Sequence, residues 1–111
     1  MLTQIAGDDG ARLPDDEGAR PTLAVDSDGR VSGFSGVNRY TSALSPDDLD
    51  QGLFSLGPVA TTRMAGPPEA MNLESRFLET LDKVSAYSVQ GDVLVLEDAR
   101  EGLLYFLKTS R

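Results

Sequence analysis

One segment of the chain, residues 67–84, has the periodicity that most constrains its fold. Apolar residues recur there at every third or fourth position and so share one face of a predicted helix: Ala70, Leu73, Phe77, Leu81 and Val84. Proline and Glu69 suit the first turn, where amide donors are free and the helix dipole favours acid, and Lys83 suits the last turn. The apolar stripe of this amphipathic helix must be buried against another part of the chain.

The other segments carry strand and turn signals. We predict a hairpin over residues 23–34 with a type I′ turn at Asp28-Gly29, a strand within residues 53–63 that ends near Pro58 or a little beyond, a second hairpin that turns at residues 90–92, and a last strand that begins near Leu103. Residues 45–52 are predicted to be a polar connection. Residues 7–18 combine glycine, proline and carboxylates and are predicted to be a loop between short strands.

The fold class follows from the ratio of strands to helices. A single helix cannot cover both faces of a sheet with this many strands, so we expect the sheet to curl and to bury its inner face under the helix. The predicted fold is α+β, a small curled antiparallel sheet, or half-open barrel, with one amphipathic helix packed against it. At 111 residues the chain suffices for one modest core, and residues 1–111 are treated as a single domain.

The charge balance bears on the partners. Acidic residues outnumber basic ones by 18 to 10, which gives a formal net charge of -8. The average surface therefore repels a phosphate backbone or an anionic lipid, and we expect no nucleic-acid partner. No apolar run approaches the roughly 20 residues that a membrane helix needs. The first residues lack the regions of a secretory signal, which leaves either a cytosolic chain or one whose leader is not in this sequence.

The chain contains no histidine and no cysteine. The commonest general base, the strongest nucleophile and most zinc-ligand sets are therefore missing together. A Ser-Lys pair or a carboxylate dyad could work in principle, but no motif marks either. We expect no enzyme activity, no cofactor and no metal site.

Two short patterns begin like ligand loops and are not completed. Residues 26–29, Asp-Ser-Asp-Gly, open like a calcium-binding EF-hand loop, but Val37 occupies loop position twelve, where a bidentate glutamate is required. Gly29, Gly33 and Gly36 lack the spacing of a dinucleotide fingerprint. We therefore assign residues 26–29 to a hairpin turn and expect no phosphate-binding loop.

Arg63 and Asn38 each have two interpretations. With the hydroxyls of residues 61–62, Arg63 could grip an anion, but the favoured interpretation is an ion pair with an acidic residue or stacking on Tyr40 or Tyr87. Asn38 is either a buried turn residue that holds its own backbone or a ligand donor.

Three blocks of the sequence resemble the META domain, also called the HslJ-like family, in order and spacing. They are GRVSGFSGVNRYTSAL, FSLGPVATTRMAGPPEAMNLESRFLETL and VSAYSVQGDVLVLED, and the resemblance extends over essentially the whole chain. The family signature falls on Gly33, Gly36, Asn38, Arg39, Tyr40, Thr62, Arg63 and Met64. We interpret these residues as structural, with glycines that allow tight sheet curvature and Asn38 fixing the backbone.

The chain departs from the family pattern at two cysteine positions, which are Val37 and Gly66 here. Because both are replaced in the same chain, we hypothesise that the two cysteines pair in relatives, which requires Cα atoms within about 7 Å. The family also tends to begin with a Trp-containing strand, whereas this chain starts MLTQI, so a leader or strand start could be missing.

The resemblance also implies a setting and a kind of activity. Relatives are typically exported bacterial proteins, often envelope lipoproteins, and include a heat-inducible stress protein linked to antibiotic tolerance. We expect a full-length protein in the periplasm or anchored to the outer membrane, a monomer or weak dimer that binds a protein or a hydrophobic small molecule without catalysis. The alternatives are a scaffold or inhibitor-like module that uses an exposed sheet edge, and an unrecognised hydrolase.

Overall fold

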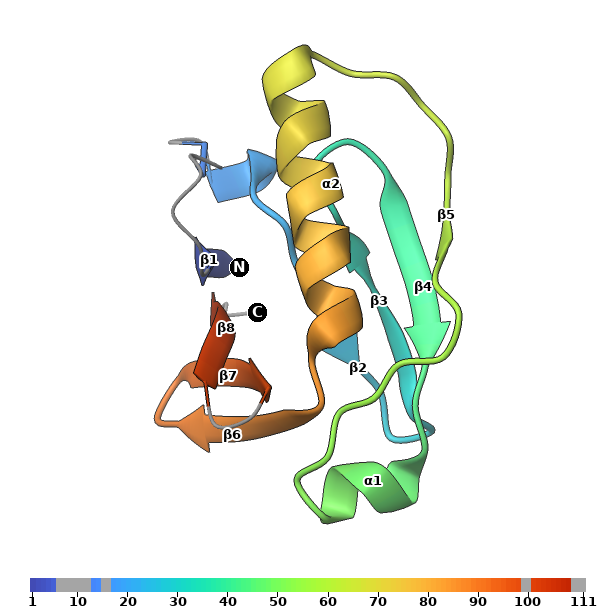
Figure 1. Cartoon of the computed structure of the whole chain (residues 1–111), viewed down its shortest axis with the longest axis vertical. Coiled ribbons are helices and arrows are strands. Elements are labelled where there is room, and N and C mark those ends of the chain that lie inside the picture. The colour runs from blue at the N-terminus through green and yellow to red at the C-terminus, as the bar shows by residue number, and fades with distance from the viewer. Residues whose placement is uncertain (6–12, 15–16, 99–100, 109–111) are drawn as a thin grey trace.

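The computed structural model of the chain describes residues 1–5, 13–14, 17–98 and 101–108 (Figure 1). Its strands are β1 (Leu2–Ile5), β2 (Ala24–Val25), β3 (Arg30–Phe34), β4 (Arg39–Ala43), β5 (Ala60–Thr61), β6 (Ala86–Gln90), β7 (Val93–Asp98) and β8 (Glu101–Leu107). Its helices are α1 (Pro46–Asp50) and α2 (Pro68–Lys83), with a 3-10 turn at Glu17–Ala19.

The strands form two four-stranded sheets in which every pairing is antiparallel. The first sheet has the order β1-β8-β7-β6, and the second has the order β2-β3-β4-β5. Figure 1 shows α2 running alongside the second sheet, with the first sheet to the left of and below the helix. The predicted α+β class and the predicted packing of one main helix against the sheet are therefore confirmed.

The two sheets are not closed into a barrel, although backbone hydrogen bonds connect them at their margins. The Leu2 N–H donates to the Pro21 carbonyl at 2.9 Å, which links β1 to the segment that leads into β2. On the other side, the Phe54 N–H donates to the Ser85 carbonyl at 3.0 Å, and the Gly57 N–H donates to the Ala43 carbonyl at 3.0 Å. Residues 54–57 thus touch both sheets without forming a strand between them.

The core is centred on Phe77 of α2. This side chain is fully buried, and its ring centroid lies 5.6 Å from that of Tyr40 on β4 and 6.1 Å from that of Phe106 on β8. One aromatic ring of the helix therefore contacts both sheets. The predicted apolar face agrees with this packing, since Leu73, Phe77 and Leu81 are buried and Ala70 is half-buried.

Both predicted hairpins are present, but the turn of the first one differs from the prediction. The Asp26 N–H donates to the Arg30 carbonyl at 3.0 Å, so residues 27–29 form a three-residue loop and not a two-residue type I′ turn, and Gly29 ends this loop with φ of +87°. The Gly29 N–H donates to the Asp26 carbonyl at 3.0 Å. The Asp26 carboxylate explains the difference, because its Oδ1 accepts the N–H groups of Asp28 at 2.9 Å and Arg30 at 3.0 Å and so stabilises the longer loop.

At the C-terminal end, the predictions hold within a few residues. β6 and β7 turn through Gly91, with φ of +62°, and Asp92, while β8 begins at Glu101, slightly before the predicted Leu103. The predicted helix over residues 67–84 is α2.

Two predictions for the middle of the chain were wrong. The connection over residues 45–52 contains α1, where Pro46 fits the first helical position and Asp47 and Asp48 favour the first turn. The strand predicted within residues 53–63 is reduced to β5, because Gly57 and Pro58 interrupt the extended segment and proline has no N–H to donate to a neighbouring strand.

Most of the loop predicted at residues 7–18 lies outside the described residues. None of the helices in the described ranges is long and apolar enough to cross a membrane.

Replacing Phe77 tests its role as the contact between the sheets. We expect Phe77→Ala to lower the free energy of unfolding by about 3–5 kcal/mol, because the substitution removes a fully buried ring and leaves a cavity. Urea denaturation followed by circular dichroism measures this change. Val89→Ala, at a side chain that is 63% exposed, is the control and should change stability by no more than about 0.5 kcal/mol. A loss below about 1 kcal/mol for Phe77→Ala would contradict the assignment.

Candidate functional site

Asn38 lies between α2 and residues 62–64, and its side chain hydrogen-bonds to both. The residue is 3% exposed. Its Nδ2 donates to Glu74 Oε2 at 2.9 Å and to the Met64 carbonyl at 3.1 Å, while its Oδ1 accepts the Thr62 hydroxyl at 2.8 Å and the Met64 N–H at 2.7 Å. All four hydrogen-bonding positions of the amide are therefore used. Asn38 is buried, as the first of its two interpretations predicted, but its side chain holds Met64, Thr62 and Glu74 and not its own backbone.

The second centre of this cluster is the carboxylate of Glu74, which α2 places against the turn between β3 and β4. Oε1 accepts the Ser35 hydroxyl at 2.7 Å and the N–H groups of Val37 at 3.1 Å and Asn38 at 2.7 Å. We call the hydrogen bonds among Ser35, Val37, Asn38, Thr62, Met64 and Glu74 the Asn38–Glu74 network.

The pKa of Glu74 is lowered even though the residue is only 8% exposed. Burial by itself raises the pKa of a carboxyl, because it disfavours the charged form. The hydrogen bonds from Asn38, Ser35 and Val37 act in the opposite direction and outweigh burial. The carboxylate is therefore ionised near neutral pH and is stabilised by neutral donors.

Gly36 permits the close approach of this turn to the helix. Its φ of +133° lies in a region that side chains rarely adopt, and a Cβ there would lie 3.2 Å from the Cβ of Glu74 and 3.1 Å from the Ala70 carbonyl oxygen. A larger residue at this position would push the turn away from Glu74.

Gly33 permits a second close contact. A Cβ at this position would lie only 2.2 Å from the Thr22 carbonyl oxygen, which accepts the Tyr40 hydroxyl at 2.6 Å. Burial of Tyr40 raises the pKa of its phenol, so the hydroxyl remains a donor. Gly33 and Tyr40 therefore fix the segment that precedes β2 against β3.

The remaining signature residues have exposed side chains. Arg39 contributes its backbone N–H to the Thr62 hydroxyl at 3.2 Å, and Met64 is 60% exposed although its backbone belongs to the Asn38–Glu74 network. Arg63 is exposed, and within the described residues it forms no ion pair and does not stack on Tyr40 or Tyr87. The favoured interpretation of Arg63 is therefore not seen, and its anion-binding alternative stays a prediction.

Sequence reasoning missed Glu74 and Ser35. Glu74 follows Leu73 on the side of α2 that is buried, and a carboxylate beside an apolar stripe was the available signal. That signal does not identify the partner, since Ser35 is 39 residues away in the chain.

Val37 and Gly66 are neighbours in space. A Cβ built on Gly66 would lie 3.5 Å from the Cβ of Val37 and 2.8 Å from its nearest methyl group. Disulfides have Cβ separations of about 3.5–4.5 Å, so these positions meet the geometric condition for the cysteine pair hypothesised in relatives. Pairing in the relatives themselves stays a prediction.

Two hollows lie next to each other between the first sheet and the chain at and just before β2. The first, with a volume of about 370 Å³, includes Leu23, Val89, Leu94 and Lys108 in its lining, and we call it the Lys108 hollow. The second, of about 410 Å³, has a lining of Leu23, Val25, Asp26, Ser27, Leu49, Phe54, Tyr87 and Leu94, and we call it the Asp26 hollow. Because Leu23 and Leu94 line both, we call the pair the inter-sheet groove.

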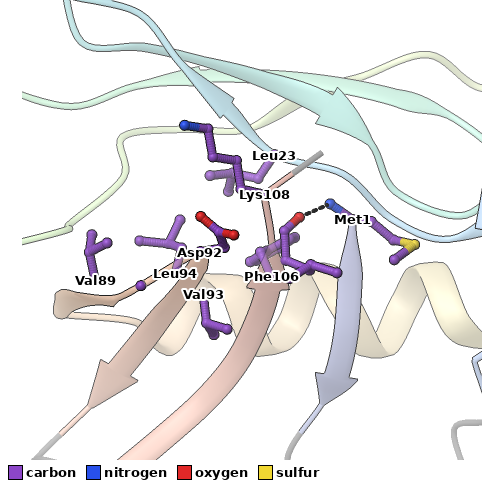
Figure 2. Close-up of a pocket in the computed structure, with 10 residues that line it drawn as sticks. Met1, Leu23, Val89, Asp92, Val93, Leu94, Phe106 and Lys108 are labelled. Carbon is purple, nitrogen blue, oxygen red and sulfur yellow. Dashed lines mark hydrogen bonds between the residues drawn. The ribbon is translucent and has the colours of Figure 1, made fainter. Parts of the chain in front are cut away.

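The Lys108 hollow combines apolar walls with two charged groups. Figure 2 shows Leu23, from the segment before β2, on the opposite side from Val89, Leu94 and Phe106 of the first sheet. Val89 and Leu107 are exposed in this region, at 63% and 38%. In the same view, Asp92 and Lys108 lie between the two sides. The groove is thus an apolar surface with a small number of charges.

No group of three or more Asp and Glu side chains in the described ranges is arranged to hold a metal ion. The expectation of no metal and no cofactor stays a prediction.

Replacement of Glu74 tests the Asn38–Glu74 network. We expect Glu74→Gln to lower the free energy of unfolding by about 1–3 kcal/mol, because the amide places a donor where Asn38 already donates. The pKa of Glu74 in the folded protein is below the ordinary value of 4.5, which applies to the unfolded chain. The ionised carboxylate therefore stabilises the wild-type fold fully above about pH 4.5, and this stabilisation is lost as the pH falls through the pKa of the folded protein. Urea denaturation at several pH values should show a smaller acid dependence in the variant. Glu79→Gln, on the exposed side of the same helix, is the matched control; equal effects of the two substitutions would contradict the assignment.

A double substitution tests the contact between positions 37 and 66. We expect Val37→Cys with Gly66→Cys to form a disulfide under mild oxidation and to raise the free energy of unfolding by about 3–4 kcal/mol relative to the reduced form, since the bond closes a loop of some 30 residues. Thiol titration and thermal denaturation with and without reductant measure both effects. The two single variants are the controls, and thiols that stay free in the folded double variant would show that the positions are not neighbours.

Comparison with known protein families assigns the chain to a family. The family model of the META domain matches residues 1–111, the whole chain. No curated protein and no solved structure gives a significant match. The matched range includes the Asn38–Glu74 network and the inter-sheet groove, and it agrees with the resemblance of the signature blocks. The chain belongs to the META domain family.

Proposed function

We propose that this META domain is a non-enzymatic binding module and that the inter-sheet groove is its binding surface. The observation that carries the proposal is the position of the two hollows, which share Leu23 and Leu94 and lie between the first sheet and the chain at and just before β2. Binding pockets are typically apolar concavities of several hundred Å³ with a few polar groups, which is the character of this groove. The partner is a protein or a hydrophobic molecule with an apolar surface.

The packing of the interior supports a surface site over an enclosed one. Val31, Phe77, Leu96 and Leu104 are fully buried in one cluster with the other core side chains. Close-packed interiors leave few voids larger than a water molecule. A partner would therefore bind in the inter-sheet groove on the surface and not in a cavity inside the fold.

The use of Glu74 supports a role without catalysis. Among the described residues, Glu74 is the one with a buried carboxylate, and both of its oxygens accept hydrogen bonds from groups within the fold. A general acid or base must reach the proton that it transfers in a substrate, whereas Glu74 faces the turn between β3 and β4.

Family membership motivates the rest of the proposal. The full-length protein would act in the periplasm or at the outer membrane, in an envelope or stress-associated role, as exported relatives do. The net charge of -8 supports a partner other than nucleic acid or an anionic membrane.

A second candidate is a scaffold that uses the outer edge of β6. On this side, residues 52–54 bond to the start of β6, where the Tyr87 N–H donates to the Gly52 carbonyl at 3.0 Å. Beyond Tyr87, no described strand pairs with this edge, and Val89 is 63% exposed. Such an edge can accept a strand of another chain. Native mass spectrometry that finds a bare dimer, which Val89→Lys dissociates, would favour this candidate.

Leu23 provides the test of the groove, because it lines both hollows and is half-buried. Nile red, a neutral apolar dye, serves as the probe. We expect Leu23→Gln to weaken its binding about five- to tenfold, since a polar amide replaces apolar contact surface. Fluorescence titration measures the affinity.

Leu53→Gln is the matched control, because Leu53 is 42% exposed and lines neither hollow. Its dye affinity should stay within about twofold of wild type. Equal dye binding by wild type and both variants would overturn the proposal, as would a failure of wild type to bind. Native mass spectrometry of protein purified gently from its host then identifies any retained ligand.

A further inference from the structure

The Asp26 hollow differs chemically from the rest of the groove. Its lining is apolar and aromatic except for Asp26 and Ser27 at the end of β2. The rings of Phe54 and Tyr87 meet edge to face within it, with centroids 6.4 Å apart. A hollow with one carboxylate, one serine and otherwise apolar and aromatic walls matches an organic cation, since the carboxylate supplies charge and the tyrosine ring supplies a π face.

Asp26 is held in place before any ligand arrives. Oδ1 accepts the N–H groups of Asp28 and Arg30 at 2.9 and 3.0 Å. Oδ2 has no hydrogen bond to a described residue, and no ion pair joins Asp26 to a cation there. The carboxylate thus keeps one oxygen available in a fixed orientation, which reduces the entropy lost on binding.

The aromatic wall is fixed as well. The Tyr87 hydroxyl donates to the Leu49 carbonyl, which ties β6 to α1 across the hollow. Asp48 and Asp50 flank Leu49 in the chain, and Asp50 is exposed. Neither of these aspartates lines the hollow, but they make α1 acidic, and no basic residue contributes to the lining.

The neighbouring Lys108 hollow indicates the kind of molecule that carries the cation. It shares Leu23 and Leu94 with the Asp26 hollow, so an occupant of both extends along the groove. Exposed Val89 adds apolar surface to the second hollow, and the edge of β6 beyond Tyr87 is unpaired by any described strand. An extended peptide matches these features, because alternate side chains can fill neighbouring hollows while its backbone runs beside a strand.

We propose that the groove binds an extended protein segment in which an arginine or lysine enters the Asp26 hollow and an apolar side chain enters the Lys108 hollow. This inference rests on the proposed function of the groove and specifies the chemistry of the partner. Asp26 pairs with the cation, and Tyr87 contacts the cationic side chain.

Two blocked peptides provide the probe, acetyl-Val-Leu-Arg-Leu-Val-amide and the same peptide with citrulline in place of arginine. Citrulline has nearly the same shape as arginine and no charge. Asp26 is exposed, so we expect wild type to bind the arginine peptide about three- to fivefold more tightly than the citrulline peptide, as measured by isothermal titration calorimetry. Asp26→Asn should abolish this preference, while its side-chain oxygen can still accept the loop N–H groups. Asp28→Asn, in the same loop but not lining the hollow, is the matched control and should retain the preference.

The outcomes separate this inference from the proposed function. If both peptides bind equally, or neither binds while Nile red does, the cation site is wrong and the apolar groove stands. If neither peptide nor Nile red binds, the groove itself is refuted. If n-butylguanidine alone binds as tightly as the arginine peptide, a small organic cation and not a protein segment is the ligand, and the proposal of a peptide partner fails. Retention of the preference in Asp26→Asn also overturns the proposal.

Discussion

The ionised carboxylate of Glu74 is the interaction on which the arrangement of helix and second sheet depends. A charge buried without compensation is strongly unfavourable, so this position is tolerated only while donors surround it. They come from Ser35, Val37 and Asn38, which all belong to one short turn. The turn and the helix therefore constrain each other, because neither can move without leaving the carboxylate unsatisfied.

Asn38 extends this constraint to residues 62–64, which have little regular structure to hold them. β5 is only two residues long, so its ladder supplies few hydrogen bonds. The amide of Asn38 replaces them by bonding to Thr62 and to both backbone groups of Met64. The buried side chain of Asn38 thus fixes residues 62–64, which the short strand β5 alone would hold weakly. This contact explains why signature residues that are distant in the sequence belong to one pattern.

The sequence could predict the elements whose signal is local, and it could not predict those whose cause is tertiary. Periodicity identified α2, and turn residues identified both hairpins. The short helix α1 was missed because five residues give no period, although Pro46 and the acids after it were a usable start signal. The role of Glu74 depends on a turn 36 to 39 residues earlier in the chain, and the groove depends on the separation of two sheets, so no local pattern contains either.

The Asn38–Glu74 network and Asp26 lie at opposite ends of β3, which begins at Arg30 and ends at Phe34. Ser35 follows the strand and contacts Glu74, while Asp26 precedes it across the hairpin loop. Five residues of strand span about 16 Å and separate Asp26 from the network. Substitution of Asp26 is therefore expected to leave the network intact. The signature that identifies the family lies mainly at the Phe34 end of β3, whereas Asp26, the residue that we propose selects the partner, lies at the other end and outside the signature; family membership alone therefore does not specify a partner.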